Sequence, residues 1–405
     1  MEVWEKNIGY TLFKNYVDRV VKHCYRRYEV SGKENIPGDG LVIFAPNHCN
    51  TLMDALVMLT TARIGAFGAR ADMFRTPFLT RLMTFFRIVP IPRIRDGAEA
   101  LKGSHNIIDR IVACLGHGVP FYLYSEGTHR PKRSLLPIRK GIFRIALEAM
   151  SKSDKPVYVV PCGIEYSDYF RFRSTLLISF GGPINVNEVV AQSEGCTDAE
   201  INRKLTEMLR EGIANLITYL PDDENYEGRW AAVKFLAAGK EGTPLENLRR
   251  NKEIIASLDD SRLEEALECE RERKRLGISV RSLGYAHQKR RTLLRSLLWL
   301  LELPYFIFCA IAAIPSWVPA LIIGRGIKDR AFINTVRFGC RLVGAQLMVF
   351  IWAPVLFINL HWAIAAAILL LMLPSVSYFY DFLEFSRVLR SDIKLARTPD
   401  FKVFK

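Results

Sequence analysis

Several patterns that would assign a function directly are missing from this sequence. The eight cysteines contain no C-x-x-C pair, so neither a disulfide framework nor a zinc knuckle is indicated. Residues 239–243 lack the spacing of a P-loop, which argues against a nucleotide-phosphate enzyme. Leu123 occupies the first glycine position of a G-x-S-x-G nucleophile elbow around Ser125, which argues against a serine hydrolase. Reduced thiols in a protein that faces the cytosol are the plain interpretation.

The N-terminal residues also lack the pattern of a secretory signal, because no basic stretch is followed by a clean apolar one. Instead, residues 10–28 place apolar and aromatic side chains at helical steps, with basic side chains between them. We therefore predict an amphipathic helix within residues 1–27. Such a helix suits the headgroup layer of a membrane. An ordinary helix packed on the core of the domain is an equal alternative.

Negative charge is scarce relative to positive charge. The 405 residues include 56 Lys and Arg against 42 Asp and Glu, a formal net charge of +14. This excess implies a polyanionic partner, either nucleic acid or an anionic bilayer. Hydrophobic residues make up 50% of the chain, which favours the bilayer. The basic residues gather beside apolar stretches rather than on a soluble face, so we expect no nucleic-acid partner.

The chain is longer than the roughly 250 residues that a single core needs, so we expect several parts. Residues 28–186 alternate short apolar strands with helical patterns, which predicts an α/β domain. A charged helical region follows over 187–290, and a membrane region over 291–405. The expected strands lie at 41–45, 64–69, 119–124, 157–162 and 176–180, and the expected helices at 51–61, 78–86, 107–115 and 141–150.

Two apolar blocks mark the last quarter of the chain. The block 342–378 is long enough for a hairpin of two short spans that turns at 359–361. The block 297–323 contains three prolines, and basic residues flank both blocks on every side. The positive-inside tendency then places all the flanks on the cytoplasmic side. We therefore predict that 297–323 is re-entrant or interfacial, with one kinked span and an outer loop at 325–341 as the alternative.

A histidine and a carboxylate follow the first expected strand. His48 and Asp54 are six residues apart, so they can meet only if His48 lies outside the helix that carries Asp54. Asn50 or Thr51 is a suitable N-cap, which would start the helix after His48. The carboxylate would then hold the imidazole in one tautomer and leave the other nitrogen to accept a proton. The alternative is that Asp54 only completes a capping box with Thr51.

Further motifs follow in order, and together they resemble those of the glycerolipid acyltransferase family of the lysophosphatidate and glycerol-phosphate acyltransferase type. The family pattern reads N-H-x4-D, G-x-x-F-I-x-R, F-P-E-G-T-R-S and V-x-x-I-P. The corresponding blocks here are 47–54, 87–93, 124–128 and 157–161. The resemblance covers roughly residues 28–186 and implies a mixed, mostly parallel sheet flanked by helices. The C-terminal membrane helices are expected from the apolar blocks alone.

The sequence departs from the family pattern at several positions. Five residues separate His48 from Asp54 rather than four, a variant similar to fungal-type glycerol-3-phosphate acyltransferases. Arg87 replaces the first glycine of the second block. Ser125 and His129 replace the family's proline and arginine in the third block. The last change leaves His129 or Arg130 to supply positive charge for the acceptor phosphate.

The resemblance implies roles for individual residues. His48 would act as general base on the acceptor hydroxyl, and Asp54 would orient it and balance its charge. Lys140, with Lys132, Arg133 and Arg139, would meet the phosphates of coenzyme A, unless these residues form a solvated basic loop. The implied substrate-binding residues are Asn47, Arg93, Glu126, Gly127, Thr128, Arg130, Lys140 and Pro161.

The expected function is that of a membrane-bound O-acyltransferase of phospholipid biosynthesis, with its catalytic domain on the cytoplasmic face. The acceptor would be glycerol 3-phosphate or 1-acylglycerol 3-phosphate, and the donor an acyl-coenzyme A or acyl carrier protein thioester. We expect no metal and no permanently bound cofactor, and membrane lipids as partners. The alternatives are a different amphiphile as acceptor, or an inactive relative that binds anionic lipid. The intact His48 and Asp54 argue against the second alternative.

Overall fold

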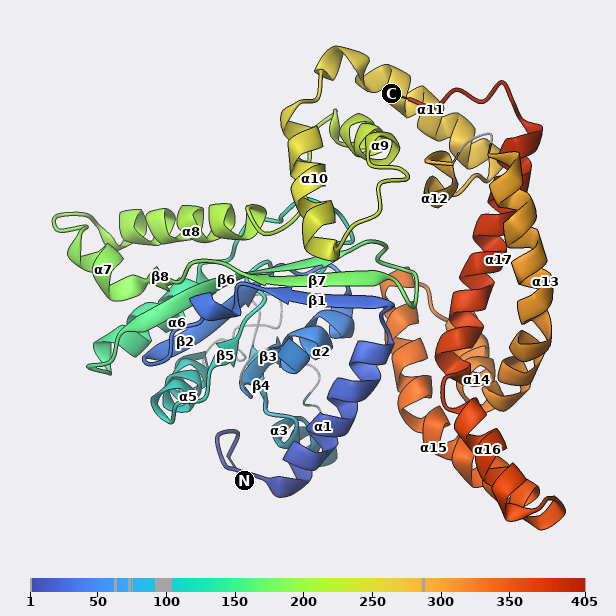
Figure 1. Ribbon diagram of the computed structural model, residues 1–405. Coiled ribbons are helices and arrows are strands. Elements are labelled where there is room, and N and C mark those ends of the chain that lie inside the picture. The colour runs from blue at the N-terminus through green and yellow to red at the C-terminus, as the bar shows by residue number, and fades with distance from the viewer. Residues whose placement is uncertain are drawn as a thin grey trace. The chain divides into compact units, whose positions relative to one another are not determined.

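The computed structural model describes residues 2–61, 64–71, 74, 76–91, 104–285 and 288–404. The chain divides into two units, which are described separately here (Figure 1). The predicted boundary at residue 186 lies inside the first unit. The first unit contains Met1–Lys22, Tyr28–Tyr169 and Leu176–Tyr219, and the second contains His23–Arg27, Phe170–Thr175 and Leu220–Lys405.

An eight-stranded sheet forms the centre of the first unit. Its strands are β1 (Arg27–Ser31), β2 (Leu41–Pro46), β3 (Ala66–Arg70), β4 (Ile88–Ile91), β5 (Phe121–Tyr122), β6 (Val157–Tyr166), β7 (Thr175–Phe180) and β8 (Ile184–Asn185). They lie in the order β1-β7-β6-β2-β5-β3-β4, with β8 beside β6. The neighbours of β2 and β3 are parallel to them, whereas β7 and β8 are antiparallel to β6. The predicted mixed, mostly parallel sheet is confirmed.

Helices flank this sheet, and four of them lie where the sequence predicts helices (Figure 1). The expected strands did not include β1, β4 or β8, because strands of two to five residues show too little periodicity. The helices are α1 (Ile8–His23), α2 (Thr51–Thr61), α3 (Pro77–Phe85), α5 (Ser104–Gly116), α6 (Gly141–Ser151), α7 (Val186–Ala191) and α8 (Asp198–Ala214).

Strand β2 is buried on both faces, which explains its uninterrupted apolar sequence. Ile43 belongs to a core formed with α5, α6 and α8. Phe44 points to the opposite face, where its ring stacks on Tyr122 with 4.8 Å between the ring centroids. The carboxyl end of β2 is therefore held firmly by side chains packed on both sides of the sheet.

Helix α1 packs on the first unit through one face. Tyr10, Val17 and Val21 are buried, and the rings of Tyr10 and Phe85 meet edge to face at 6.0 Å. This packing agrees with the second interpretation of the N-terminal segment, an ordinary helix against the domain. Ile8 is nevertheless 81% exposed. Contact of this end of the helix with a membrane stays a prediction.

The second unit begins with four helices and ends with a tail that returns to them. The helices are α9 (Tyr226–Leu236), α10 (Pro244–Ala256), α11 (Leu263–Leu276) and α12 (Val280–Leu283). Phe235 and Leu263 share an apolar cluster with Phe401 and Phe404 near the C-terminus. These helices therefore have their own small core.

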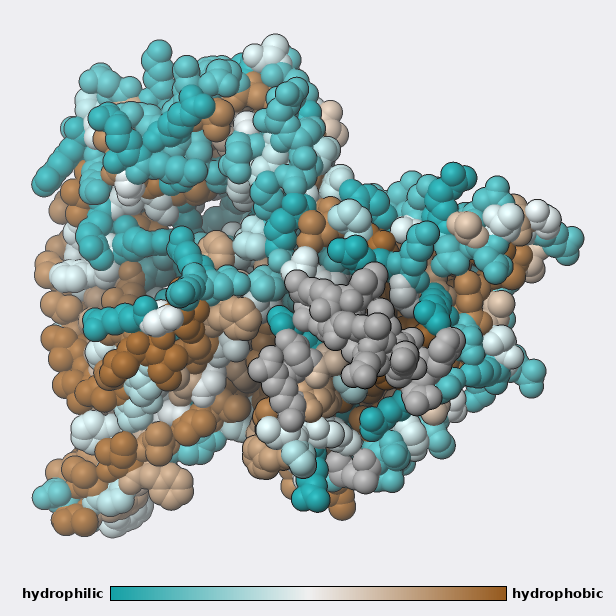
Figure 2. Space-filling model, turned by 180° about the vertical axis from the view of Figure 1, so that it is seen from behind, coloured by the Kyte–Doolittle hydropathy of each residue, from teal (hydrophilic) through white to brown (hydrophobic). Residues whose placement is uncertain are grey.

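Five further helices of the second unit carry the apolar blocks. They are α13 (Lys289–Ala312), α14 (Ile314–Arg325), α15 (Ile333–Asn359), α16 (Trp362–Met372) and α17 (Ser375–Arg397). In the described chain, Lys289–Ala312 and Arg330–Asn359 are each long and apolar enough to cross a membrane. The bent pair α16 and α17 makes a third candidate. Figure 2 shows the hydrophobic surface of these helices in brown at the lower left.

The breaks in these helices follow the sequence. The second block turns where it was predicted to, because α15 ends at Asn359 and His361 caps α16. The first block breaks at Ala313, and the 12 residues of α14 are too few to cross a membrane alone. Helix α14 packs closely on α15: a Cβ added to Gly344 would lie 2.8 Å from Ser316 Cα. The re-entrant or interfacial placement of the first block stays a prediction.

Candidate active site

The turn between β2 and α2 holds His48 at the carboxyl end of a buried strand. Helix α2 begins at Thr51, so His48 lies ahead of the helix and Asp54 lies in its first turn, as predicted. Thr51 has a φ of 47°, in the left-handed region that a β-branched residue rarely adopts. Backbone strain of this kind persists only where the surrounding contacts enforce it. The turn is therefore a specifically stabilised conformation.

His48 and Asp54 form a direct contact. The distance between His48 Nδ1 and Asp54 Oδ2 is 2.8 Å. The Asp54 side chain is fully buried, whereas that of His48 is 18% exposed. A carboxylate on Nδ1 favours the tautomer with its proton there, which leaves Nε2 as a proton acceptor. The pair is therefore arranged for general-base chemistry.

Asp54 receives hydrogen bonds from three further donors. The backbone N–H groups of Cys49 and Asn50 donate to Oδ2 at 2.8 and 2.7 Å. The Tyr166 hydroxyl donates to Oδ1 at 2.8 Å. Asp54 thus holds the turn ahead of α2, a larger role than that of a capping-box partner for Thr51. Sequence reasoning missed Tyr166, because it is 112 residues away and nothing in its local sequence marks it.

We expect Tyr166→Phe to lower turnover without unfolding the protein. The loss of a hydrogen bond to a charged group costs about 1.5–3 kcal/mol, so the effect on rate should be roughly tenfold or more. The carboxylate would carry more charge density and stabilise a protonated His48, so the acidic limb of the pH–rate profile should move to higher pH. Tyr158→Phe, on the same strand, is the matched control. An unchanged profile in Tyr166→Phe would contradict this role.

Cys49 lies beside the pair but is a poor alternative nucleophile. Its Sγ lies 3.8 Å from Asp54 Oδ1. Burial, reinforced by the Asp54 charge, raises the pKa of the Cys49 thiol well above its usual value. A thiol attacks as its thiolate, which this site disfavours.

Glu126 holds the backbone of His48. Its Oε1 accepts the His48 N–H and its Oε2 accepts the Leu136 N–H, both at 2.8 Å. The Arg130 N–H donates to the His48 carbonyl at 3.0 Å, so His48 is held on both sides. Burial raises the pKa of the Glu126 carboxyl, and the two backbone bonds lower it in part. These contacts favour a positioning role, and the predicted contact of Glu126 with substrate stays a prediction.

Asn47 and Pro161 are also held inside the fold. The Asn47 amide bonds to both the N–H and the carbonyl of Ile164, at 2.7 and 3.1 Å, and so extends the pairing of β2 with β6. Pro161 lies opposite Ala45 in that pairing and is buried under α8, where a Cβ on Gly212 would come within 2.7 Å of its ring. Their observed contacts favour structural roles, and contact with substrate stays a prediction.

The rim around His48 carries other predicted residues. Gly127 and Thr128 are exposed beside it, and Gly127 has the φ of 72° that this turn requires. The His48 ring lies 4.5 Å from the Tyr124 ring and 5.7 Å from the His129 ring, centroid to centroid. Glu126 and Arg130 of the β5–α6 connection contact the His48 backbone, so this turn lies next to that connection. The third motif therefore faces the first one, as the resemblance implies.

The predicted basic residues divide into two groups. Arg130 bonds Ser134 Oγ at 2.7 Å and is half-buried, and Lys140 is exposed where α6 begins. Arg133 is instead buried and paired with Glu165, which argues against contact with coenzyme A phosphates, and that contact stays a prediction. Arg93 lies outside the described residues.

Among the residues that are described, no three His, Cys, Asp or Glu side chains are grouped to hold a metal ion.

Arg87 shows how the second motif tolerates a lost glycine. Its φ is 58°, the left-handed conformation that glycine adopts without steric cost. The Arg87 side chain is buried, donates to the Glu5 carbonyl at 2.8 Å and lies over the Tyr10 ring. Contacts with the N-terminal segment therefore accompany the unusual backbone at this position.

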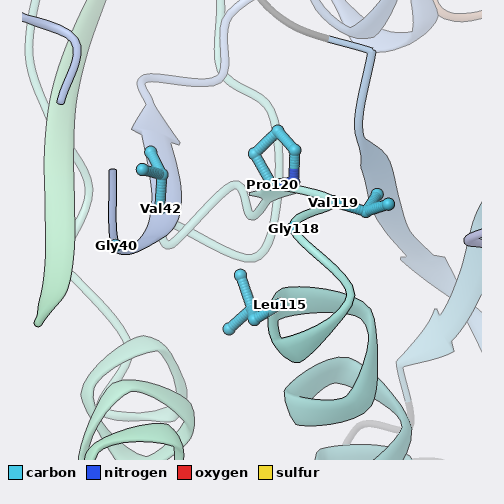
Figure 3. A pocket seen from close by; sticks show the side chains of 6 residues that line it. All are labelled: Gly40, Val42, Leu115, Gly118, Val119 and Pro120. Carbon is cyan, nitrogen blue, oxygen red and sulfur yellow. The ribbon is translucent and has the colours of Figure 1, made fainter. Parts of the chain in front are cut away.

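A small pocket lies at the other end of the sheet, where β2 and β5 begin (Figure 3). It has no titratable or nucleophilic side chain, so it offers no chemistry of its own. Its lining residues are Gly40, Val42, Leu115, Gly118, Val119 and Pro120. The candidate site is therefore the turn at His48.

Comparisons with known proteins agree with these motifs. Residues 27–165 match the family model described as Acyltransferase. Residues 27–165 therefore form an acyltransferase-family domain. The acyltransferase domain includes His48, Asp54 and the third motif, and the resemblance predicted from the sequence is confirmed.

The acyltransferase domain is similar to several named proteins. It is 29% identical over 121 residues to Glycerol-3-phosphate O-acyltransferase 1 of Saccharomyces cerevisiae, which is 29% of this chain and 16% of the yeast protein. It is 24% identical over 125 residues to a chloroplastic 1-acyl-sn-glycerol-3-phosphate acyltransferase of Brassica napus, 30% of this chain and 34% of that protein. The matches thus span about a sixth and a third of these relatives.

A solved structure is also similar to part of the chain. It is the 1-acyl-sn-glycerophosphate acyltransferase PlsC of Thermotoga maritima. The match has 21% sequence identity and a TM-score of 0.37, and it covers 51% of this chain and 79% of that one.

Proposed function

We propose that this protein is a membrane-bound O-acyltransferase that moves a fatty acyl group from a thioester to a hydroxyl of glycerol 3-phosphate or 1-acylglycerol 3-phosphate. The contact between His48 Nδ1 and Asp54 Oδ2 carries the proposal, because it leaves Nε2 on the exposed side as a base. The printed activities of the yeast and Brassica relatives support the choice of acceptor. The apolar helices of the second unit support the membrane location.

The proposed reaction is a direct transfer. His48 Nε2 takes the proton of the acceptor hydroxyl as its oxygen attacks the thioester carbonyl. Asp54 stabilises the imidazolium that forms. The tetrahedral intermediate then expels the thiolate, which takes the proton from His48, so a C–O bond replaces the C–S bond. The acceptor phosphate would contact Arg93, Thr128 and Arg130.

The donor would be a thioester of coenzyme A or of acyl carrier protein, with Lys140 near its phosphates. We also propose that the acyltransferase domain faces the cytoplasm, because basic residues lie on both sides of each apolar block, 297–323 and 342–378. Labelling of single cysteines placed in the segment 326–332, between α14 and α15, tests this orientation. Labelling by a membrane-impermeant reagent from the outer face would contradict it.

The activity is tested with the full chain purified in detergent. Two radiolabelled donors are used, acyl-coenzyme A and the acyl thioester of acyl carrier protein. Each donor is supplied in turn with glycerol 3-phosphate, 1-acylglycerol 3-phosphate, glycerol or a different amphiphilic alcohol. We expect label in the product of at least one glycerol phosphate, and none with glycerol. Transfer to the other amphiphile alone would overturn the proposed acceptor. No transfer at all, with lipid still bound, would favour an inactive lipid-binding relative.

A further inference from the structure

Three arginines from separate segments of the second unit form ion pairs with one carboxylate on α17, and the charge of a fourth acts on one of them. The carboxylate is Glu384, and we name the group the guanidinium cluster. Two of its members lie in the segments His23–Arg27 and Phe170–Thr175, and the others in α12 and α17. The arginines are Arg26, Arg171, Arg281 and Arg387.

The distances show that several charges converge on the same carboxylate. Glu384 Oε1 lies 2.7 Å from Arg171 Nη1 and 3.4 Å from Arg281 Nη1. Glu384 Oε2 lies 2.9 Å from Arg387 Nη2. One turn earlier on α17, Asp381 accepts two hydrogen bonds from Arg173, from Nε at 3.2 Å and from Nη2 at 2.7 Å. In that neighbouring pair one arginine meets one carboxylate, whereas three arginines share the carboxylate of Glu384.

The excess positive charge is partly removed from water. Burial, followed by the nearby charge of Arg171, lowers the pKa of Arg281 to about 10, and Arg26 adds to this repulsion. All four guanidinium groups remain charged at neutral pH. Three guanidinium groups that share one carboxylate favour the approach of a further anion. The cluster therefore has the charge of an anion-binding site.

The cluster is also open on one side. The side chains of Arg281 and Arg387 are 36% and 56% exposed, whereas those of Arg171 and Glu384 are mostly covered. A ligand can therefore reach two guanidinium groups from solvent or from a headgroup layer. The planar guanidinium group binds phosphate oxygens in pairs, which makes phosphate the anion best matched to this arrangement.

The neighbouring helices place the cluster at one end of the apolar region. Helices α13 and α17 lie side by side, with Trp299 Nε1 donating to Ser386 Oγ at 2.7 Å and Arg295 paired with Asp392 at 2.6 Å (Figure 1). Glu384 is two residues from Ser386, where the apolar run of α13 meets its basic flank. Tryptophan is enriched at membrane interfaces. A membrane that covers the apolar run of α13 would therefore place the cluster at the depth of lipid headgroups.

We propose that the guanidinium cluster binds the phosphate of an anionic glycerophospholipid. The inference rests on the proposed membrane location, but it needs no catalysis by His48. A soluble phosphate would offer the same chemistry, so the test has to separate the two sources. A lipid seated here would join α12, α17 and the segment Phe170–Thr175 through a single headgroup.

The test measures lipid binding to the full chain in detergent. Native mass spectrometry and thermal melting are carried out with phosphatidic acid, phosphatidylcholine, coenzyme A and inorganic phosphate at equal concentrations. We expect phosphatidic acid to bind on the order of tenfold more tightly than phosphatidylcholine, and its binding to weaken as salt rises. Equal binding of the two lipids would overturn the proposal. If coenzyme A or inorganic phosphate raised the melting temperature and phosphatidic acid did not, the lipid assignment would be overturned.

Variants localise the binding. Arg281→Gln with Arg387→Gln should weaken phosphatidic acid binding on the order of tenfold or more, since each lost contact is charge-assisted. Arg275→Gln is the matched control, because Arg275 forms an exposed pair with Glu272 in the same unit. Arg281→Lys with Arg387→Lys keeps the charge and should show an intermediate loss. The double Gln variant should keep acyl transfer through His48 in detergent, which separates this proposal from the catalytic one. Unchanged binding in the double Gln variant would overturn the site.

Discussion

Replacing His48 with alanine should lower the turnover of acyl transfer by roughly 10²- to 10⁴-fold, the usual contribution of a general base. The fold should survive, because the contacts that hold the turn at His48 are mostly backbone contacts. The His48 N–H still donates to Glu126, and its carbonyl still accepts from Arg130. Turnover under saturating donor and acceptor, with a melting curve of each protein, checks both parts of this expectation.

The matched control is His129→Ala. The His129 ring lies 5.7 Å from that of His48 and shares its rim, whereas the Asp54 carboxylate contacts Nδ1 of His48. We expect this variant to change turnover only a few-fold. Comparable losses in the two variants, or near-normal turnover in His48→Ala, would contradict the assignment of His48 as the base.

The local part of the site could be predicted from the sequence. A cap residue at 50 or 51 requires α2 to start after His48, and the geometry of one helical turn then brings Asp54 back to the imidazole. The apolar run 41–45 places this turn at the end of a buried strand. These are short-range consequences of spacing and capping, so they need no knowledge of the rest of the chain.

The long-range part of the site could not be predicted in the same way. Tyr166 reaches Asp54, and Glu126 reaches the His48 backbone, only because β6 and the β5–α6 connection flank β2. Strand order is a property of the whole sheet, which no local pattern encodes. The resemblance to the family motifs predicts that Glu126 lies at the site, but it does not predict the hydrogen bond between Glu126 and the His48 N–H. It therefore suggested substrate binding for a residue whose observed contacts position the histidine.

The left-handed conformation of Arg87 illustrates another limit. A family glycine marks a backbone requirement, and an arginine at that position makes the requirement invisible in a single sequence. The structure keeps the φ that glycine would have, and the side chain packs on the N-terminal segment. The departure from the motif thus preserves the backbone while the side chain gains contacts that glycine cannot make.

The second unit follows the same division between local and long-range information. Its apolar helices and the turn at 359–361 follow from composition alone. The segment Phe170–Thr175 belongs to this unit through pairs such as Arg171 with Glu384, which lie 213 residues apart. Such pairs have no signature in the sequence, so the guanidinium cluster emerged only from the structure.

Replacing Asp54 with asparagine should lower turnover by roughly 10²- to 10³-fold while preserving the fold. Asparagine can place its oxygen where Oδ2 now accepts from His48, Cys49 and Asn50, and its amide can donate to the Tyr166 hydroxyl. The geometry is kept, but the charge that stabilises the imidazolium is lost. Removal of one partner of a buried ion pair costs about 3–5 kcal/mol, which sets this range.

The pH–rate profile and the matched variant Asp54→Ala complete the test. Without the carboxylate the imidazole is harder to protonate, so the acidic limb of Asp54→Asn should move to lower pH, opposite to that of Tyr166→Phe. Asp54→Ala leaves the hydrogen-bond donors of the turn without an acceptor. Each buried donor that loses its partner destabilises the fold by about 1–3 kcal/mol, so this variant should melt at a clearly lower temperature. If Asp54→Asn melted as early as Asp54→Ala, its loss of turnover would reflect the fold. If it kept near-normal turnover, Asp54 would serve only to hold the turn.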